Sequence, residues 1–219
     1  MAVSFPFAGA RPPDARLSII YLIYLQSMTD RAGGDGARLA ALFHHRWAGA
    51  TLTELHRSRG AKFVTLLHRL GAGRGTLQRT LDTLAGLRLV RRNPGYGHPM
   101  RPEWVVTAAG ARLAPACGEL LRRVRRLGVQ EVAGRKWAFP VVLALDGGLD
   151  RFSLIESSIP GVTARALAMT LREMEGAGVV ERRVEDAHPP RVRYRLAPSA
   201  RHLVPPLLRL ARETAATVR

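Results

Sequence analysis

The sequence has one cysteine, Cys117, among its 219 residues. A single cysteine excludes an internal disulfide and a metal cluster built on cysteines, which fits a reducing cytoplasm. Cys117 falls in a helical pattern among Leu113, Leu120 and Leu121. We therefore expect a small buried hydrophobe at this position rather than a redox switch.

Long apolar runs are also missing. The most apolar stretch, LSIIYLIYLQSM at residues 17 to 28, is shorter than the roughly 20 residues that a membrane-spanning helix needs. The first residues show no basic region followed by an apolar core and a cleavage site, so we predict no signal peptide and no membrane partner. We expect residues 17 to 28 to form an amphipathic helix, packed on the body of the protein or at a subunit interface.

The sequence lacks the usual motifs of catalysis. It has no Gly-rich phosphate loop, no Gly-x-Ser-x-Gly, no zinc-protease motif and no paired carboxylates among chain breakers. His98 and His188 have no ligand partner at a useful spacing, and the adjacent His44 and His45 would diverge on a helix. We predict that the protein is not an enzyme and has neither a metal site nor another cofactor.

Acidic residues are scarce, with 17 against 34 basic residues and a net charge of +17. GC-rich codon usage favours arginine and alanine, but that bias alone does not explain the excess of basic over acidic residues. Residues 36 to 125 carry 16 basic and 4 acidic residues, whereas residues 126 to 219 carry 15 and 10. This balance favours a polyanionic partner, either nucleic acid or an anionic membrane surface.

The chain contains an internal repeat with a period of 90 residues. An ungapped comparison of residues 47 to 122 with 137 to 212 gives 17 identities in 76 positions, where roughly six are expected by chance. The basic segment RRNPGYGHPMRPEWVV, which begins at Arg91, thereby matches ERRVEDAHPPRVRYRL, which begins at Glu181. The repeat predicts three parts: an N-terminal extension with one helix (1–34), a first domain (35–125) and a second domain (126–219).

Three helices are predicted at the start of the second copy. Residues 137 to 145 form an apolar helix that ends at Asp146-Gly147-Gly148. The Ser-x-x-Glu pattern from Ser153 to Glu156 is typical of a capping box that opens a second helix. Thr163 can cap a third helix, which ends at Gly176 and Gly178, and whose inward stripe consists of Leu167, Leu171 and Met174.

A hairpin and a last helix follow. Residues 191 to 196 alternate strictly, so we expect Val192, Tyr194 and Leu196 to face inward and three arginines to face outward. Residues 179 to 184 supply the partner strand, and a final helix begins at Pro198-Ser199. The order helix, helix, helix, hairpin, helix is that of a winged helix-turn-helix, in which the third helix enters the DNA major groove and the hairpin wing lies on the neighbouring backbone.

Several short motifs of the second copy point to one family. They are Arg135-Lys136-Trp137, Asp150-Arg151-Phe152-Ser153, Pro160-Gly161-Val162-Thr163, Leu171-Arg172-Glu173-Met174-Glu175, Gly178-Val179-Val180-Glu181-Arg182 and Pro189-Pro190-Arg191-Val192-Arg193-Tyr194. Over about 85 residues this copy resembles the HxlR-type winged-helix transcriptional regulators of bacteria. The first copy is more divergent and is assigned mainly through the internal repeat; it keeps Arg46-Trp47, Leu77, Leu81, Gly86, Leu89-Val90-Arg91-Arg92 and His98-Pro99-x-Arg101.

The resemblance implies a mainly α fold with small β-hairpin wings (α+β) and double-stranded DNA as the partner. Family members commonly act as homodimers joined through terminal helices, so two tandem winged helix-turn-helix domains could form a monomeric pseudo-dimer, or the chain could pair again as a homodimer. Many members place a cysteine before the first helix, where this chain has Leu39-Ala40-Ala41 and Val129-Gln130-Glu131. This departure argues against thiol-based sensing.

DNA contacts divide into those that read bases and those that bind phosphates. We expect the first copy to read bases more strongly, because Met169 of the second copy stands at the position of Arg79, and we expect the second copy to contribute more through its wing arginines. The candidate base-reading residues are Arg74, Thr76, Gln78, Arg79, Thr163, Arg165 and Thr170. The candidate backbone contacts of the wings are Arg91, Arg92, Arg101, Arg182, Arg183, Arg191 and Arg193.

The sequence thus predicts a sequence-specific, double-stranded DNA-binding transcriptional regulator in the cytoplasm, associated with the nucleoid. A small-molecule effector is left open. Two alternatives also stay open: a repurposed winged-helix module that binds a small molecule or a protein, and a nucleoid-type protein that binds DNA without sequence preference.

Overall fold

A computed structural model describes residues 46–93, 103–159, 161–186 and 191–216 of the chain. The helix expected at residues 17 to 28 lies outside this part, as do the histidines at 44, 45, 98 and 188 and the wing residue Arg101. Over the described residues the fold is mostly helical with two small antiparallel strand pairs. No helix in these ranges is long and apolar enough to cross a membrane.

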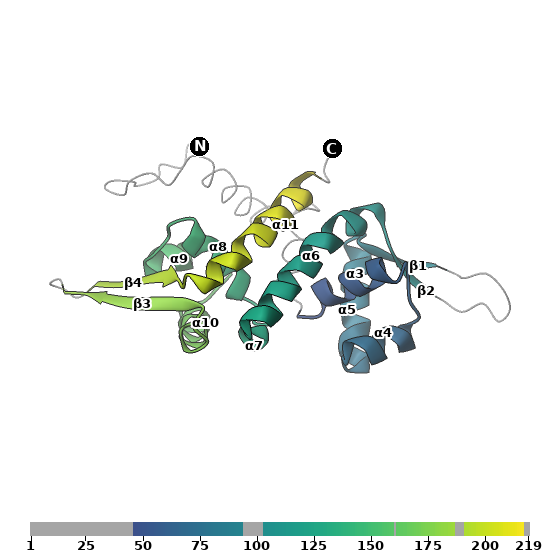
Figure 1. The fold of residues 1–219 in the computed structure, drawn as a ribbon, viewed down its shortest axis with the longest axis horizontal. Coiled ribbons are helices and arrows are strands. Elements are labelled where there is room, and N and C mark those ends of the chain that lie inside the picture. The colour runs from purple at the N-terminus through teal and green to yellow at the C-terminus, as the bar shows by residue number, and fades with distance from the viewer. Residues whose placement is uncertain (1–45, 94–102, 160, 187–190, 217–219) are drawn as a thin grey trace.

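The described elements repeat the order helix, helix, helix, hairpin, helix (Figure 1). The first set consists of α3 (Ala48–Arg57), α4 (Phe63–Leu70), α5 (Arg74–Gly86), β1 (Val90–Asn93), β2 (Glu103–Val106) and α6 (Ala108–Leu127). A short helix, α7 (Gln130–Ala133), connects it to α8 (Ala138–Asp146), α9 (Phe152–Ser158), α10 (Ala164–Gly176), β3 (Val180–Glu185), β4 (Arg191–Leu196), the 3₁₀ helix η1 (Ser199–Leu203) and α11 (Val204–Ala216). The element order predicted for the second copy is confirmed.

The starts of α9 and α10 test two predicted caps. Thr163 caps α10 as expected, since its hydroxyl oxygen accepts a hydrogen bond from the Ala166 N–H. The capping box at Ser153 is wrong, because the N-cap of α9 lies two residues earlier, at Arg151, which makes no side-chain cap, and the helix begins at Phe152. The Ile155 N–H donates to the Arg151 carbonyl at 2.9 Å, and Ile155 is fully buried. Burial of the apolar side chain therefore sets the start of this helix.

The spacing between matching residues of the two copies is not constant along the repeat. Phe63 and Phe152, the first residues of α4 and α9, are 89 positions apart, and so are the fully buried Leu66 and Ile155. The period returns to 90 at the left-handed glycines Gly71 and Gly161, which precede α5 and α10. An ungapped comparison therefore misaligns α4 and α9 by one residue. The second copy is one residue shorter than the first before this helix and one residue longer after it.

Each hairpin is attached to the body of its half. In the first, Val90 pairs with Val106 and Asn93 with Glu103, and Trp104 also exchanges two backbone hydrogen bonds with Ala61. In the second, the pairing extends from Val180 with Leu196 to Glu185 with Arg191. The predicted inward face of β4 is only partly buried: Leu196 is buried, while Val192 and Tyr194 are half-buried.

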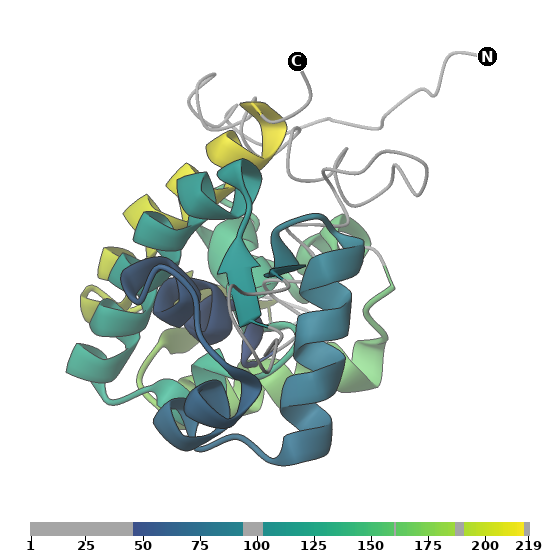
Figure 2. The ribbon, with the colours of Figure 1, turned by 90° about the vertical axis from the view of Figure 1, so that its right-hand side faces the viewer.

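The last helices of the two halves, α6 and α11, pack side by side (Figures 1 and 2). They lie at the centre of the molecule, and the hairpins point outward at opposite ends (Figure 1). Leu120 and Val124 of α6 and Leu207 and Leu210 of α11 are buried in one continuous core. Along this seam the Arg123 guanidinium donates to the His202 carbonyl at 2.5 Å.

The two last helices begin differently for a local reason. The Thr107 hydroxyl caps α6 by accepting from the Gly110 N–H. Ala197 occupies the matching position before the second terminal helix and has no hydroxyl. There the chain forms η1 before α11, starting with an Ala200 N–H bond to the Ala197 carbonyl.

Candidate nucleic-acid interface

The exposed face of α5 carries the candidate base-reading residues of the first half. Arg74 and Arg79 are exposed, and Thr76 and Gln78 are half-buried at the rim of the helix. The Arg74 guanidinium lies 5.5 Å from the centre of the Phe63 ring, which supports it from α4. Arg79 makes no recorded ion pair within the described residues, so its charge is available to a ligand.

The first hairpin brings further cations to the same surface. Arg91 and Arg92 on β1 are exposed, and the Arg92 guanidinium lies 5.0 Å from the centre of the Trp104 ring on β2. Helix α5 and the hairpin together form a hollow, which we call the α5 hollow. It is lined by Phe63, Arg74, Gly75, Gln78, Arg92 and Trp104. Side chains predicted separately as base and backbone contacts therefore meet at one site.

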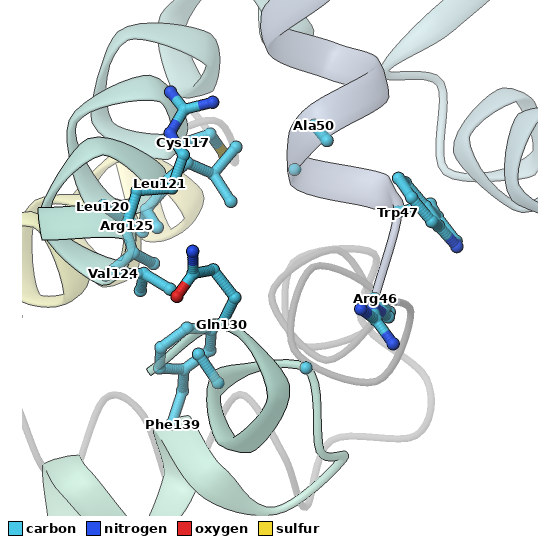
Figure 3. Close-up of a pocket in the computed structure, with 14 residues that line it drawn as sticks. Arg46, Trp47, Ala50, Cys117, Leu120, Leu121, Val124, Arg125, Gln130 and Phe139 are labelled. Carbon is cyan, nitrogen blue, oxygen red and sulfur yellow. The ribbon is translucent and has the colours of Figure 1, made fainter. Parts of the chain in front are cut away.

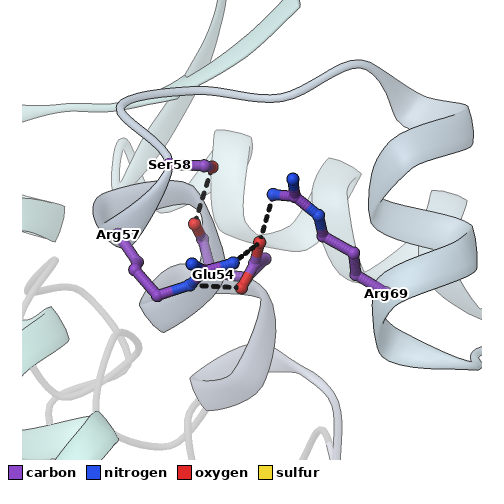
Figure 4. A network of polar contacts seen from close by, with 4 residues as sticks. All are labelled: Glu54, Arg57, Ser58 and Arg69. Atoms are coloured by element: carbon purple, nitrogen blue, oxygen red, sulfur yellow. Dashed lines mark hydrogen bonds and ion pairs between the residues drawn. The ribbon is translucent and has the colours of Figure 1, made fainter.

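An ion-pair network holds α4, which supports this surface, against α3 (Figure 4). Glu54 of α3 accepts hydrogen bonds from Arg57, at 2.8 Å, and from Arg69 of α4, at 2.6 Å. Burial alone would raise the pKa of Glu54, but the two guanidinium groups outweigh it and hold the pKa below its ordinary value. Arg69 is therefore engaged in positioning α4.

The second half offers fewer polar groups on the matching helix. Arg165 is exposed on α10, and the exposed Thr163 uses its hydroxyl as the helix cap. Placing Thr170 on the exposed face is wrong: it is 5% exposed, and its hydroxyl donates to the Ala166 carbonyl. The sequence carried a signal for this, because Thr170 lies three residues after Leu167 and four before Met174, on the buried stripe.

Apolar side chains occupy the exposed face of α10. Met169 is 51% exposed, and Ala164 and Ala168 are exposed beside it in the helix. Ala166, on the same helix, is half-buried. A surface of this kind has no donors or acceptors for base edges but can contact a thymine methyl group.

Carboxylates offset several arginines of the second hairpin. Arg193, on β4, pairs with Asp150 at 2.5 Å and with Glu185 at 2.6 Å. Glu181 lies 2.7 Å from Arg195 and 4.0 Å from Arg183. This compensation runs against the expectation that the second half contributes more through its wing, since only part of the arginine charge is left for phosphates.

A second hollow lies at the corresponding place between α10 and its hairpin, and we call it the α10 hollow. It is lined by Ala168, Leu171, Arg172, Glu175, Arg182 and Tyr194. Ala168, Arg182 and Tyr194 correspond by the 90-residue period to Gln78, Arg92 and Trp104 of the α5 hollow. The α10 hollow thus lies at the place in the second half that corresponds to the α5 hollow. Unlike the α5 hollow, it has an acidic residue, Glu175, in its lining.

The sequence alone does not reveal the residues that stack against or neutralise the candidate DNA-binding arginines. Phe63 and Trp104 lie under guanidinium groups, and Asp150 pairs with an arginine 43 residues away. No spacing rule marks such pairs, because they depend on how a loop meets a hairpin. Among the described residues no group of three or more His, Cys, Asp or Glu side chains could hold a metal ion.

Comparison with known proteins finds a matching family model and several relatives for the second half of the chain. Residues 132–217 match the family model described as HxlR-like helix-turn-helix. An uncharacterized HTH-type transcriptional regulator of Methanothermobacter thermautotrophicus is 41% identical over 79 residues, covering 36% of this chain and 60% of that protein. The HTH-type regulator YvaP of Bacillus subtilis is 35% identical over 75 residues, covering 34% of this chain and 69% of YvaP.

YkvN of Bacillus subtilis, also described as an HTH-type transcriptional regulator, is 40% identical over 65 residues, or 55% of its length. The chain thus spans between about half and two thirds of the length of these relatives. The family model matches residues 132–217, and the chain covers 69% of the length of YvaP at 35% identity. The chain therefore belongs to the HxlR-like helix-turn-helix family through residues 132–217.

Proposed function

We propose that this protein is a sequence-specific regulator of transcription that binds double-stranded DNA. Family membership and the relatives named HTH-type transcriptional regulators support this function. We further propose that residues 35–125 and 126–219 are two winged helix-turn-helix domains and that the chain acts as a pseudo-dimer in the cytoplasm, associated with the nucleoid. The repeated element order and the central pairing of α6 with α11 support this arrangement.

The α5 hollow is the observation on which the proposal rests. Helix α5 enters the major groove, where Arg79 can bind guanine through two hydrogen bonds and Gln78 can do the same with adenine. Gln78 now donates to Asp82 at 2.8 Å, so it must exchange this partner for a base. Arg91 and Arg92 bind the adjacent phosphates, which fixes the register of the helix on the duplex.

The two halves contribute unequally in this proposal. Helix α5 presents Arg74 and Arg79, whereas α10 presents Arg165 and the apolar Met169. We therefore expect two unequal half-sites about one helical turn apart, roughly 10 bp. The half-site under α10 should be the less strictly defined of the two.

Selection of bound duplexes from a random pool, followed by binding measurements at two salt concentrations, tests the function. A regulator returns a motif and a steep dependence on salt. An architectural protein returns the same salt dependence without a motif. Recovery of no duplex above background would contradict the proposal and favour a module that binds a protein or a small molecule.

Substitutions in the two helices test the unequal roles. Arg79→Ala should relax the preference at one position of the selected motif and weaken binding by about 1–3 kcal/mol. Met169→Ala should change affinity by less than threefold. The exposed Arg126 lies on α6 and so belongs to neither α5, α10 nor a hairpin, and Arg126→Ala is the matched control. If Arg79→Ala keeps the motif while Met169→Ala abolishes it, the roles are reversed.

A further inference from the structure

A cavity of about 220 Å³ lies between the two halves of the chain, away from both hollows (Figure 3). Helix α6 forms one wall and the start of α3 forms the opposite wall. Gln130 of α7 and Phe139 of α8 close the cavity on the side of the second half. Elements of both halves and the helix that connects them therefore share this space.

The interior of the cavity is apolar. Cys117 is buried, and burial raises the pKa of its thiol to about 12, so the sulfur is protonated at neutral pH and contributes an uncharged wall. A Cβ added at Gly49 would lie in ordinary contact with Cys117, at 3.8 Å, so this glycine leaves room for a methyl group beside the sulfur. The other apolar lining residues are Leu120, Leu121, Val124, Phe139 and Leu210.

The rim of the cavity is cationic. Arg46 and Arg125 line it and are exposed, and none of the described lining residues is acidic. Arg46 lies 5.7 Å from the centre of the Trp47 ring, and neither arginine makes a recorded ion pair within the described residues. The Gln130 amide, which points toward the space between α6 and α3 in Figure 3, adds an uncharged hydrogen-bonding group.

We propose that this cavity binds a small aromatic carboxylate. An apolar cavity of about 150 Å³ can hold benzene, so the larger volume here suits a single ring with a short apolar substituent. Burying the ring against Leu121 and Phe139 supplies affinity, while Arg125 at the rim binds the carboxylate. A dication or an anionic polymer does not match an apolar interior of this size.

The location of the cavity predicts a regulatory effect, and this second step rests on the proposed DNA-binding function. A ligand that contacts α3, α6 and Phe139 together alters the spacing of the halves, and so the spacing of α5 and α10 on DNA. The effect must be reciprocal, because a ligand that changes DNA affinity has its own affinity changed by DNA in the same ratio.

Calorimetry on the full chain without DNA tests the binding step with two probes of the same shape, 4-ethylbenzoate and 4-ethylbenzamide. We expect saturable one-to-one binding of the carboxylate at least tenfold tighter than that of the amide. Equal affinities would overturn the carboxylate assignment, and absence of saturable binding of either probe would overturn the site.

Two pairs of variants locate the bound probe. Gly49→Leu places a side chain in the cavity and should abolish binding, whereas Gly49→Ala adds only a Cβ that fits and should retain it. Arg125→Gln should weaken carboxylate binding about tenfold and leave amide binding unchanged. Arg126→Gln removes a neighbouring exposed charge outside the cavity and should have no effect. Thermal unfolding of each variant checks that it folds.

The regulatory step is tested separately, with the duplex recovered by selection. A saturating amount of 4-ethylbenzoate should change the Kd for this duplex at least threefold in the parent chain, and not in the Gly49→Leu variant. Binding of the probe without any change in DNA affinity would overturn the regulatory step. Failure to recover a duplex would count against the proposed function and leave the calorimetric result standing as evidence for the site.

Discussion

Glu54 is a largely buried carboxylate whose two arginine partners come from different helices. Its side chain is 14% exposed, and Arg57 and Arg69 both donate to it. A carboxylate with a lowered pKa stabilises the fold at any pH above its ordinary value near 4.5, and this contribution is lost as the pH falls through the folded-state pKa. Helix α4 should therefore be attached less firmly in acid.

We predict that Glu54→Gln lowers the free energy of unfolding by about 1 kcal/mol at pH 7, because the charge-assisted bonds to both arginines are weakened. The difference from the parent chain should shrink below pH 4.5. Urea unfolding at several pH values measures both effects. Glu131→Gln is the control, since Glu131 is exposed and makes no recorded ion pair among the described residues. A difference that persists unchanged at pH 3 would contradict the role of the carboxylate charge.

Single residues also mark where prediction from sequence fails. Buried Cys117 is confirmed, because its helical neighbours are apolar and the pattern is local. The exposed position predicted for Thr170 is wrong, because its spacing to Leu167 and Met174 places it on the buried stripe of α10. Its hydroxyl is satisfied by the Ala166 carbonyl of its own helix, so a buried threonine has no unmet hydrogen bond.

Among the elements of the first half, α6 closely approaches the backbone before β1. A Cβ added at Gly110 would lie 2.1 Å from the carbonyl oxygen of Leu89. The Thr107 hydroxyl also donates to the Arg88 carbonyl at 2.7 Å, which ties the start of α6 to the same segment. The register of the first hairpin against α6 therefore depends on this glycine.

We predict that Gly110→Ala lowers the free energy of unfolding by about 2–3 kcal/mol, because the backbone of Leu89 must move to admit the methyl group. Gly86→Ala is the control: Gly86 lies in α5, and an added Cβ there would meet nothing within 4 Å, so this change should be neutral or slightly stabilising. Chemical unfolding of both variants distinguishes them. Equal stabilities would show that α6 can shift without cost.

The two hairpins have similar sequences and different charge balance. Arg92 stacks on Trp104 and makes no recorded ion pair within the described residues, whereas Arg195 pairs with Glu181. An arginine already paired with a carboxylate releases fewer counterions from DNA than one that is not. The first hairpin should therefore contribute more to affinity.

We predict that Arg92→Ala weakens binding to the selected duplex three- to tenfold and lowers the slope of log affinity against log salt by about one. Arg195→Ala should weaken binding less than twofold. Glu181→Gln should strengthen binding, because it releases Arg195 and Arg183. Titrations at several salt concentrations measure all three. A larger loss from Arg195→Ala than from Arg92→Ala would restore the second hairpin as the main phosphate contact.

At the scale of the whole molecule, α6 and α11 already bury their apolar faces against each other. Ion pairs of Glu119 with Arg123 and with Arg209 add polar contacts along the same seam. The resemblance implies that family members join through terminal helices, and here the last helices of the two halves are paired within one chain. We therefore expect that a second chain would need a different surface.

We predict that light scattering gives the mass of one chain for the free protein and of one chain plus one duplex for the complex. The reason is that a single chain presents both α5 and α10 to DNA. A duplex in which one of the two unequal half-sites is scrambled should bind more weakly and keep the same stoichiometry. Two chains on one intact duplex would contradict the pseudo-dimer and favour a homodimer.

Local patterns in the sequence were sufficient to predict the order of elements, the hairpins, the cap at Thr163 and the family. Each of these depends on neighbours in the chain, through apolar spacing, strand alternation or a hydroxyl beside a free N–H. An ungapped comparison cannot show the one-residue shift between α4 and α9. Two length differences, one on each side of this helix, cancel each other, so the 90-residue period is unchanged in the rest of the repeat.

Which charges are available to a ligand, and where the two halves meet, cannot be predicted from local patterns. The pairing of Arg193 with Asp150, the stacking of Arg92 on Trp104 and the cavity beside Cys117 all join segments distant in sequence. Every arginine carries a positive charge, but whether that charge is available to DNA depends on the carboxylate or aromatic ring that folding brings within a few ångströms of it.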